Sequence, residues 1–85
     1  MKPYKDLLEE DFILRKFSSD IDPIELMWHR DERDRIVRSE EKTNWMFQID
    51  NELPKPIEGD VFIPKLVWHR TIKGNGDLVI KIKEL

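Results

Sequence analysis

The chain of 85 residues contains no cysteine and only three glycines. Without cysteine there are no disulfides and no thiolate metal sites, so any metal ion must be held by nitrogen and oxygen ligands. No stretch approaches the roughly 18 consecutive apolar residues that span a membrane, and residues 1–5 lack the apolar segment of a signal peptide. We therefore expect a cytoplasmic protein with no membrane partner.

Neither sign of charge dominates the chain. Eighteen acidic and fifteen basic residues give a net charge of −3, which argues against a general nucleic-acid binder. Four arginines lie between positions 30 and 38, but acidic residues interrupt them, a pattern typical of a mixed-charge solvated face. A nucleic-acid binder would need these arginines to form one exposed patch. The length fits one small domain over residues 1–85.

Short apolar runs with period-2 alternation and frequent turn residues indicate an antiparallel β-sandwich or barrel. We predict a short opening helix after Pro3, on the spacing of Leu7, Leu8 and Phe12. The predicted strands lie at about 12–18, 24–31, 34–40, 44–50, 60–65, 67–73 and 77–84, with a further edge strand near 53–58. The Gly-Asn-Gly-Asp run at 74–77 predicts a hairpin that pairs the last two strands.

The most informative feature is the tripeptide Trp-His-Arg, which occurs at 28–30 and again at 68–70 and contains both histidines of the chain. On a strand, residues two apart share a face, so His29 and Asp31 could hold one ion together. If His69 faces them across a small barrel, the site becomes two imidazoles and one carboxylate. That ligand set is typical of non-haem Fe(II) centres with open coordination positions.

The segment before the second histidine resembles the second conserved motif of the cupin superfamily. That motif runs glycine, five residues, proline, four residues including a glycine, then a metal-binding histidine. In this chain Gly59 and Pro64 are separated by four residues, Pro64 and His69 by four, and Leu66 stands where the family usually has glycine.

The segment around the first histidine resembles the first cupin motif, His-x-His followed after three or four residues by glutamate. His29 matches the first ligand, Asp31 replaces the second histidine, and Arg35 stands at the position of the glutamate. Neither of the glycines that flank this motif is present. The forty positions between His29 and His69 fit the usual separation of the two motifs in short members.

The resemblance implies an all-β fold, a small cupin-like double-stranded β-helix (a jelly-roll barrel), here with the short N-terminal helix. It also implies a divalent metal on His29, Asp31 and His69, with Fe(II) favoured and Mn or Zn as alternatives. The ligand would be a small anionic molecule. Candidate substrate-binding residues are Arg35, Gln48 and Arg70.

Whether the protein is an enzyme stays open, and no catalytic residue is assigned. An enzyme of this kind would be a metal-dependent oxygenase or isomerase. A 2-oxoglutarate-dependent oxygenase would need a basic residue after the distal histidine and a longer chain. The competing interpretation is a non-catalytic cupin-fold module with a degenerate metal site, in which Arg35 pairs with Asp31. The face with Trp28 and Trp68 is too apolar to stay uncovered, and the opening helix, a second sheet or another subunit could cover it. Because small barrels also have sheet edges to hide, we expect a homodimer.

Overall fold

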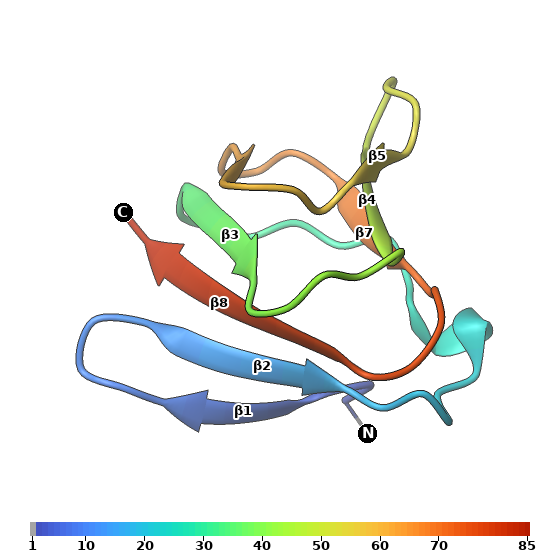
Figure 1. The fold of residues 1–85 in the computed structure, drawn as a ribbon. Helices are drawn as coiled ribbons and strands as arrows, with labels where there is room; N and C mark the ends of the chain where they lie inside the picture. The colour runs from blue at the N-terminus through green and yellow to red at the C-terminus, as the bar shows by residue number, and fades with distance from the viewer. Residues whose placement is uncertain (1) are drawn as a thin grey trace.

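The computed structural model describes residues 2–85 and shows two antiparallel sheets packed face to face (Figure 1). In spatial order the five-stranded sheet contains β1 (Lys5–Leu8), β2 (Ile13–Phe17), β8 (Leu78–Glu84), β3 (Arg35–Ser39) and β6 (Val61–Ile63). The three-stranded sheet contains β5 (Lys55–Pro56), β4 (Met46–Ile49) and β7 (His69–Ile72). A single 3-10 turn, η1 (Pro23–Glu25), precedes β3.

The core lies between the two sheets and follows from strand alternation. In β8 the apolar residues Leu78, Ile80 and Ile82 are buried, whereas Lys81 between them is exposed. Each fully buried aliphatic side chain contributes roughly 1.5–3 kcal/mol relative to exposure. Trp45 is completely buried at the entry to β4, and its indole Nε1 donates to two carbonyl oxygens of the loop at 75–76.

The predicted opening helix is wrong, because residues 5–8 form the edge strand β1. β1 pairs antiparallel with β2, and Asp6 lies directly opposite Arg15 in the ladder. The two side chains form a bidentate ion pair with N–O distances of 2.8 and 3.0 Å. Leu7 and Leu8, spaced for a helix face, are instead exposed. Pairing with a neighbouring strand has outweighed the local helical pattern.

The strand predicted at 24–31 is also wrong. Asp22 caps a short turn by accepting from the N–H of Ile24, and Pro23 occupies its first position. The following residues are irregular apart from one isolated bridge, in which His29 pairs with His69. The other predicted strands match β2 to β8 within a few residues at each end.

The loop at 74–77 is a turn but not a hairpin, because β7 pairs with β4 while β8 lies between β2 and β3. The chain therefore crosses here from one sheet to the other. Gly74 is required by close approach: a Cβ atom would lie 2.3 Å from Asn44 Oδ1 and 2.6 Å from the Trp45 nitrogen. The Asn-Gly signal predicted a reversal correctly but not the partner strand.

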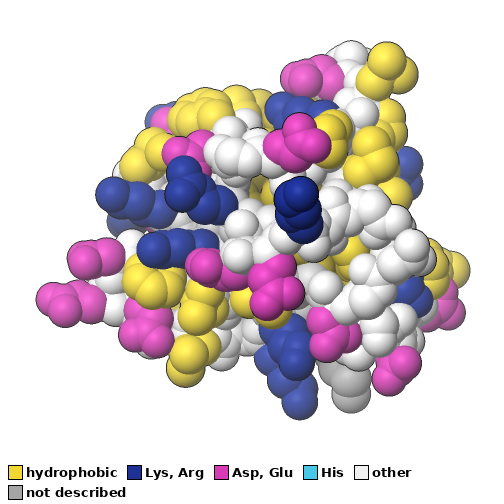
Figure 2. Space-filling model, viewed as in Figure 1, with side chains coloured by type: hydrophobic (Ala, Val, Ile, Leu, Met, Phe, Trp, Pro, Cys, Tyr) yellow, Lys and Arg dark blue, Asp and Glu magenta, His cyan; other side chains and the backbone are white. Residues whose placement is uncertain are grey.

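Charged side chains of both signs are interspersed on the face drawn in Figure 2, with apolar side chains between them. Within residues 2–85 we find no helix with the length and apolar character of a transmembrane span.

Candidate metal centre

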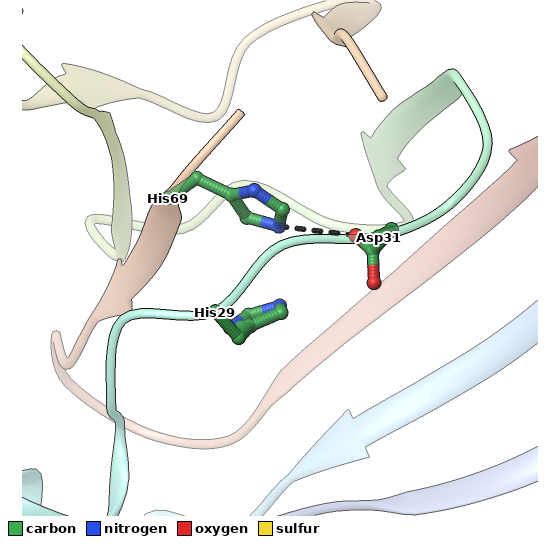
Figure 3. A group of neighbouring side chains, drawn as sticks. All are labelled: His29, Asp31 and His69. Atoms are coloured by element: carbon green, nitrogen blue, oxygen red, sulfur yellow. Dashed lines mark ion pairs between the residues drawn. The ribbon is translucent and has the colours of Figure 1, made fainter. Parts of the chain in front are cut away.

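Two backbone hydrogen bonds bring the repeated tripeptides together. His69 is the first residue of β7, and its N–H and carbonyl exchange hydrogen bonds with those of His29 at 2.8 and 2.9 Å. The imidazole centroids are 4.3 Å apart, with the rings inclined at 62°. Asp31 follows two residues after His29, and Figure 3 shows its carboxylate next to both rings. The structure thus assembles the three predicted ligands from segments forty residues apart.

Each histidine is oriented by its own backbone. His69 Nδ1 lies 2.9 Å from the carbonyl oxygen of Val67, and His29 Nδ1 lies 3.2 Å from that of Met27. A carbonyl oxygen only accepts, so each Nδ1 carries the hydrogen. In the neutral rings both Nε2 atoms then hold free lone pairs. Such outer contacts are what fix the tautomer and direction of metal-binding histidines.

Asp31 Oδ2 is a buried oxygen without a geometrically sound hydrogen bond. It lies 3.2 Å from His69 Nε2 and 3.3 Å from Arg35 Nη1, but these are charge contacts and not aligned hydrogen bonds. With the Nδ1 hydrogen of His69 committed to Val67, a neutral ring would direct a lone pair at this oxygen. A cation shared by the two atoms, or a second proton on His69, removes that repulsion.

The donor set fits a divalent metal ion. One ligand atom from each of His29, Asp31 and His69 lies within 4.8 Å of the others. Metal–ligand bonds of about 2.1 Å place neighbouring ligand atoms roughly 3.0–3.4 Å apart, and the observed Asp31–His69 distance falls in this range. Two imidazoles and a carboxylate suit Fe(II), Mn and Zn.

The local electrostatics favour the deprotonated ligands. The side chain of His29 is exposed as a whole, but desolvation of its ring lowers its pKa below the ordinary value and outweighs the hydrogen bond to Met27. Burial alone would raise the pKa of Asp31. The contact with His69 and the positive charge of Arg35 together outweigh it, so the pKa of this carboxylate lies below its ordinary value. A neutral imidazole and an ionised carboxylate are the forms that bind metal.

The loop before β7 holds the carboxylate segment in place. The N–H of Leu66 donates to the Asp31 carbonyl at 2.7 Å, and the N–H of Lys65 donates to Asp34 Oδ1 at 2.8 Å. Leu66 has φ of +61°, the left-handed conformation that glycine adopts without cost. The glycine expected at this position in the second motif is therefore absent, but its backbone conformation is retained.

Arg35 contacts carboxylates on both sides. Its guanidinium lies 3.3 Å from Asp31 and 3.2 Å from Glu84, and its side chain is largely buried. It also lines the cavity described below. The arginine at the glutamate position thus donates hydrogen bonds to Glu84 and faces Asp31 by charge.

A cavity of about 340 Å³ opens between the sheets beside both histidines. Its walls are mostly apolar, with side chains from both sheets and from the loop after η1. Its polar lining comes from Tyr4, Arg15, Glu25, His29, Arg35, His69 and Thr71. A cavity of this size and character is typical of small-molecule sites.

Two of the three predicted substrate-binding residues lie elsewhere. Arg70 donates to Gln48 at 2.9 Å, and its guanidinium lies 4.9 Å from the ring of Trp28. Both residues alternate with inward-facing neighbours on β7 and β4, so they lie on the outer face of the three-stranded sheet. Neither lines the cavity.

Sequence reasoning missed Arg15, which lines the cavity and is 8% exposed. The signal was available, since a strand at 12–18 with Phe17 buried places Arg15 on the same inward face. Thr71, two residues after His69 on β7, is buried against the cavity by the same alternation.

No protein-family model matches the chain, and no curated protein matches it. Solved structures match closely in shape. A Neisseria meningitidis protein superposes with a TM-score of 0.60 at 15% identity, over 96% of this chain and 81% of that one. KdgF from Halomonas sp. gives a TM-score of 0.64 at 17% identity, over 95% of this chain and 77% of that one.

Hydroxypropylphosphonic acid epoxidase from S. wedmorenis, HppE, gives a TM-score of 0.66 at 17% identity, over 96% of this chain and 50% of that one. The chain has the cupin fold. It spans about half the length of the HppE chains. The two histidines come from the two segments that resemble cupin motifs, and the cavity lies between the sheets.

Proposed function

We propose that this cupin-fold protein binds a divalent metal ion through His29, Asp31 and His69, with Fe(II) first and Mn or Zn behind it. One observation carries the proposal. His69 Nε2 lies 3.2 Å from an Asp31 oxygen that is buried without a hydrogen-bond partner, and a ring nitrogen of His29 lies within 4.8 Å of this pair. The site is the only group of three ligating side chains found within residues 2–85.

The protein itself would bind and orient a small molecule next to this centre. A bound ion would supply Lewis-acid or, for Fe(II), oxygen-dependent chemistry at its open positions. The apolar walls would pack against the body of the molecule, and Arg35 favours the ionised form of Asp31. Oxygenase and isomerase chemistry both stay compatible with these residues.

Structural neighbours support the proposal without deciding it. HppE structures have been solved as the Fe(II) form with an alternative substrate and as the Co(II) form with substrate. Those properties belong to HppE, whose chain is about twice as long. What transfers to this chain as a proposal is the use of the same fold to place a metal at a small-molecule cavity.

The competing function is a binding module without metal. Here a doubly protonated His69 would donate to Asp31, and the carboxylate would lie between this imidazolium and Arg35. The contacts at 3.2 and 3.3 Å are compatible with that network. What favours the metal is the second histidine, because the Nε2 of His29 has no role in the ion-pair network.

Metal content decides between the two functions. Untagged protein purified without chelator is measured by elemental analysis, before and after anaerobic reconstitution with Fe(II). We expect close to one ion per chain, lost in His69→Ala and in His29→Ala while the far-ultraviolet circular dichroism is retained. Arg70→Ala, outside the cavity, serves as the control. Absence of metal under both conditions would contradict a metal-dependent enzyme function.

We also propose that the chain forms a homodimer through the outer face of the three-stranded sheet, in keeping with a cytoplasmic protein. Trp28 and Trp68 are 39% and 45% exposed there, and Leu66 lies nearby in sequence with 54% exposed. Arginines cover part of the tryptophans, since Arg30 lies 5.2 Å from the Trp68 ring. Sedimentation equilibrium should give twice the chain mass, and Trp68→Lys should give the chain mass.

A further inference from the structure

The cavity has a second polar end besides the metal centre. Within residues 2–85, Arg15 of β2 is the only buried arginine. It lines the same cavity as His29 and His69. We propose that Arg15 binds the carboxylate of a substrate that has an apolar body and a metal-binding end. This inference rests on the proposed function, since it assigns the ligand class of the same site.

Contacts with neighbours orient Arg15 and leave part of its guanidinium free. Nε and Nη2 donate to the two oxygens of Asp6, at 2.8 and 3.0 Å. The ring of Tyr4 covers one face, with the guanidinium carbon 3.7 Å from its centroid. No group of residues 2–85 accepts a hydrogen bond from Nη1. Asp6 and Tyr4 thus orient the arginine, and Nη1, which is not among the enclosed unpartnered atoms, keeps two N–H groups open to a ligand.

A buried arginine is costly unless its donors are used. An ion pair with Asp6 does not by itself require a buried arginine. Arg38 and Asp60 form a 2.8 Å pair between largely exposed side chains. Arg15 is instead placed against Phe17 and the apolar cavity lining. A charged donor in an apolar cavity is the arrangement that selects an anionic oxygen by a charge-assisted hydrogen bond.

The size of the cavity limits the rest of the ligand. A cavity of about 150 Å³ holds benzene, so about 340 Å³ has room for a body of roughly ten non-hydrogen atoms. Most of the lining is aliphatic or aromatic, including Val37, Phe47 and Ile80. The predicted ligand is a small aryl or alkyl carboxylate, with the carboxylate at Arg15 and its other polar group at the histidines.

Calorimetric titration with 3-phenylpropionate and its uncharged amide tests this assignment. Both are titrated into metal-free and into Zn-treated protein, because Zn undergoes no redox chemistry. In wild type the carboxylate should bind at least about tenfold more tightly than the amide. The Asp6→Asn/Arg15→Met variant should lose this preference without leaving an unpaired carboxylate. The Arg38→Met/Asp60→Asn variant removes a matched surface pair and should keep it.

Equal binding of acid and amide to wild type, or an unchanged preference in the Arg15 variant, overturns the proposal. So does the absence of binding by the carboxylate. If the Arg15 variant fails to fold, nitrogen NMR on wild type replaces it: 3-phenylpropionate should shift the Arg15 guanidinium resonances and leave those of Arg38 unchanged, and the reverse refutes the assignment. The metal-free titration keeps this test separate from metal binding, whose failure would show in the elemental analysis.

Discussion

The two Trp-His-Arg tripeptides have the same sequence but different surroundings. His69 opens β7, is 3% exposed and contacts Asp31. His29 lies in an irregular segment, is exposed, and belongs to regular pairing only through its bridge to His69. Each arginine lies over the tryptophan ring of the other tripeptide, so two reciprocal cation–π contacts join the two segments.

His69 belongs to a regular strand, whereas His29 belongs to an irregular segment. His69 is fixed by a strand ladder, by Val67 and by burial between the sheets. His29 is positioned by two backbone hydrogen bonds and the Met27 carbonyl at the opening of the cavity. Under the proposed function, the buried histidine would fix the metal ion and the exposed one would lie where a small molecule enters.

Alanine substitution of each histidine should separate these roles most clearly. Removing a residue that only hydrogen-bonds a ligand weakens metal binding by about 10–100-fold. Loss of either histidine removes a ligand itself, so we expect a loss of more than about 100-fold. In metal-free protein, His69→Ala should lower the free energy of unfolding by about 2–4 kcal/mol because it removes a buried ring and leaves a cavity between the sheets. His29→Ala should cost less than about 1 kcal/mol. Metal titration and urea unfolding measure both, and equal losses of stability would contradict the distinction.

Asp31 joins the two halves, and its substitution should have the next largest effect. Asp31→Asn removes the charge that faces Arg35 and His69, so we expect a loss of about 1–3 kcal/mol in unfolding free energy. Asp60→Asn disrupts an exposed pair with Arg38 and should change stability by no more than about 0.5 kcal/mol. Urea denaturation of the two variants gives the contrast, and a cost as small for Asp31 as for Asp60 would show that its pair is weak.

The pH dependence of stability should identify His29. Partial desolvation of its ring lowers its pKa in the folded protein below the value of about 6.5 expected in the unfolded chain. Below about pH 6.5 the unfolded state therefore binds more protons at this residue, and the free energy of unfolding falls as the pH drops toward the folded pKa. Above pH 6.5 the contribution is constant. Metal-free wild type should show this fall by thermal unfolding between pH 7.5 and 5, and His29→Gln should reduce its slope.

The arginines of the tripeptides should give the smallest contrast. Arg70→Met removes both the hydrogen bond to Gln48 and the contact with Trp28, a loss of about 1 kcal/mol. Arg30→Met removes only the contact with Trp68 and should cost about 0.5 kcal/mol. Thermal unfolding at pH 7.5 measures both. Neither variant should change metal content, because neither residue lines the cavity.

Much of the fold was predictable because strand alternation records which face is buried. The pattern of Leu78, Ile80 and Ile82 located β8, and the cupin-like segment before His69 indicated the fold. The three candidate ligands were predictable because the only two histidines lie in the same repeated tripeptide and Asp31 lies two residues after the first. Their approach to one another in the structure bears out the grouping, while metal binding stays a prediction.

The errors come from partners that local sequence does not encode. Residues 5–8 have helical spacing, but the open edge of β2 pairs with them. The Gly-rich turn at 74–77 predicts a reversal, yet which strand comes next to β8 is decided by packing across the whole sheet. Gln48 and Arg70 were assigned by residue type, although strand alternation already set them opposite Phe47 and Thr71, which the structure buries. A role for them in substrate binding stays a prediction.

The position of β8 has a consequence for how the protein is made. Its residues, Leu78–Glu84, lie in the middle of the five-stranded sheet, with β2 on one side and β3 on the other. A ribosome adds roughly 5–20 residues per second, and until this strand emerges the earlier strands have no central partner. The sheet must therefore form after residue 84 has been synthesised, in a late step dominated by long-range pairing. Until then β2 and β3 expose unpaired edges, and this is the interval in which the chain is most open to aggregation or chaperone capture.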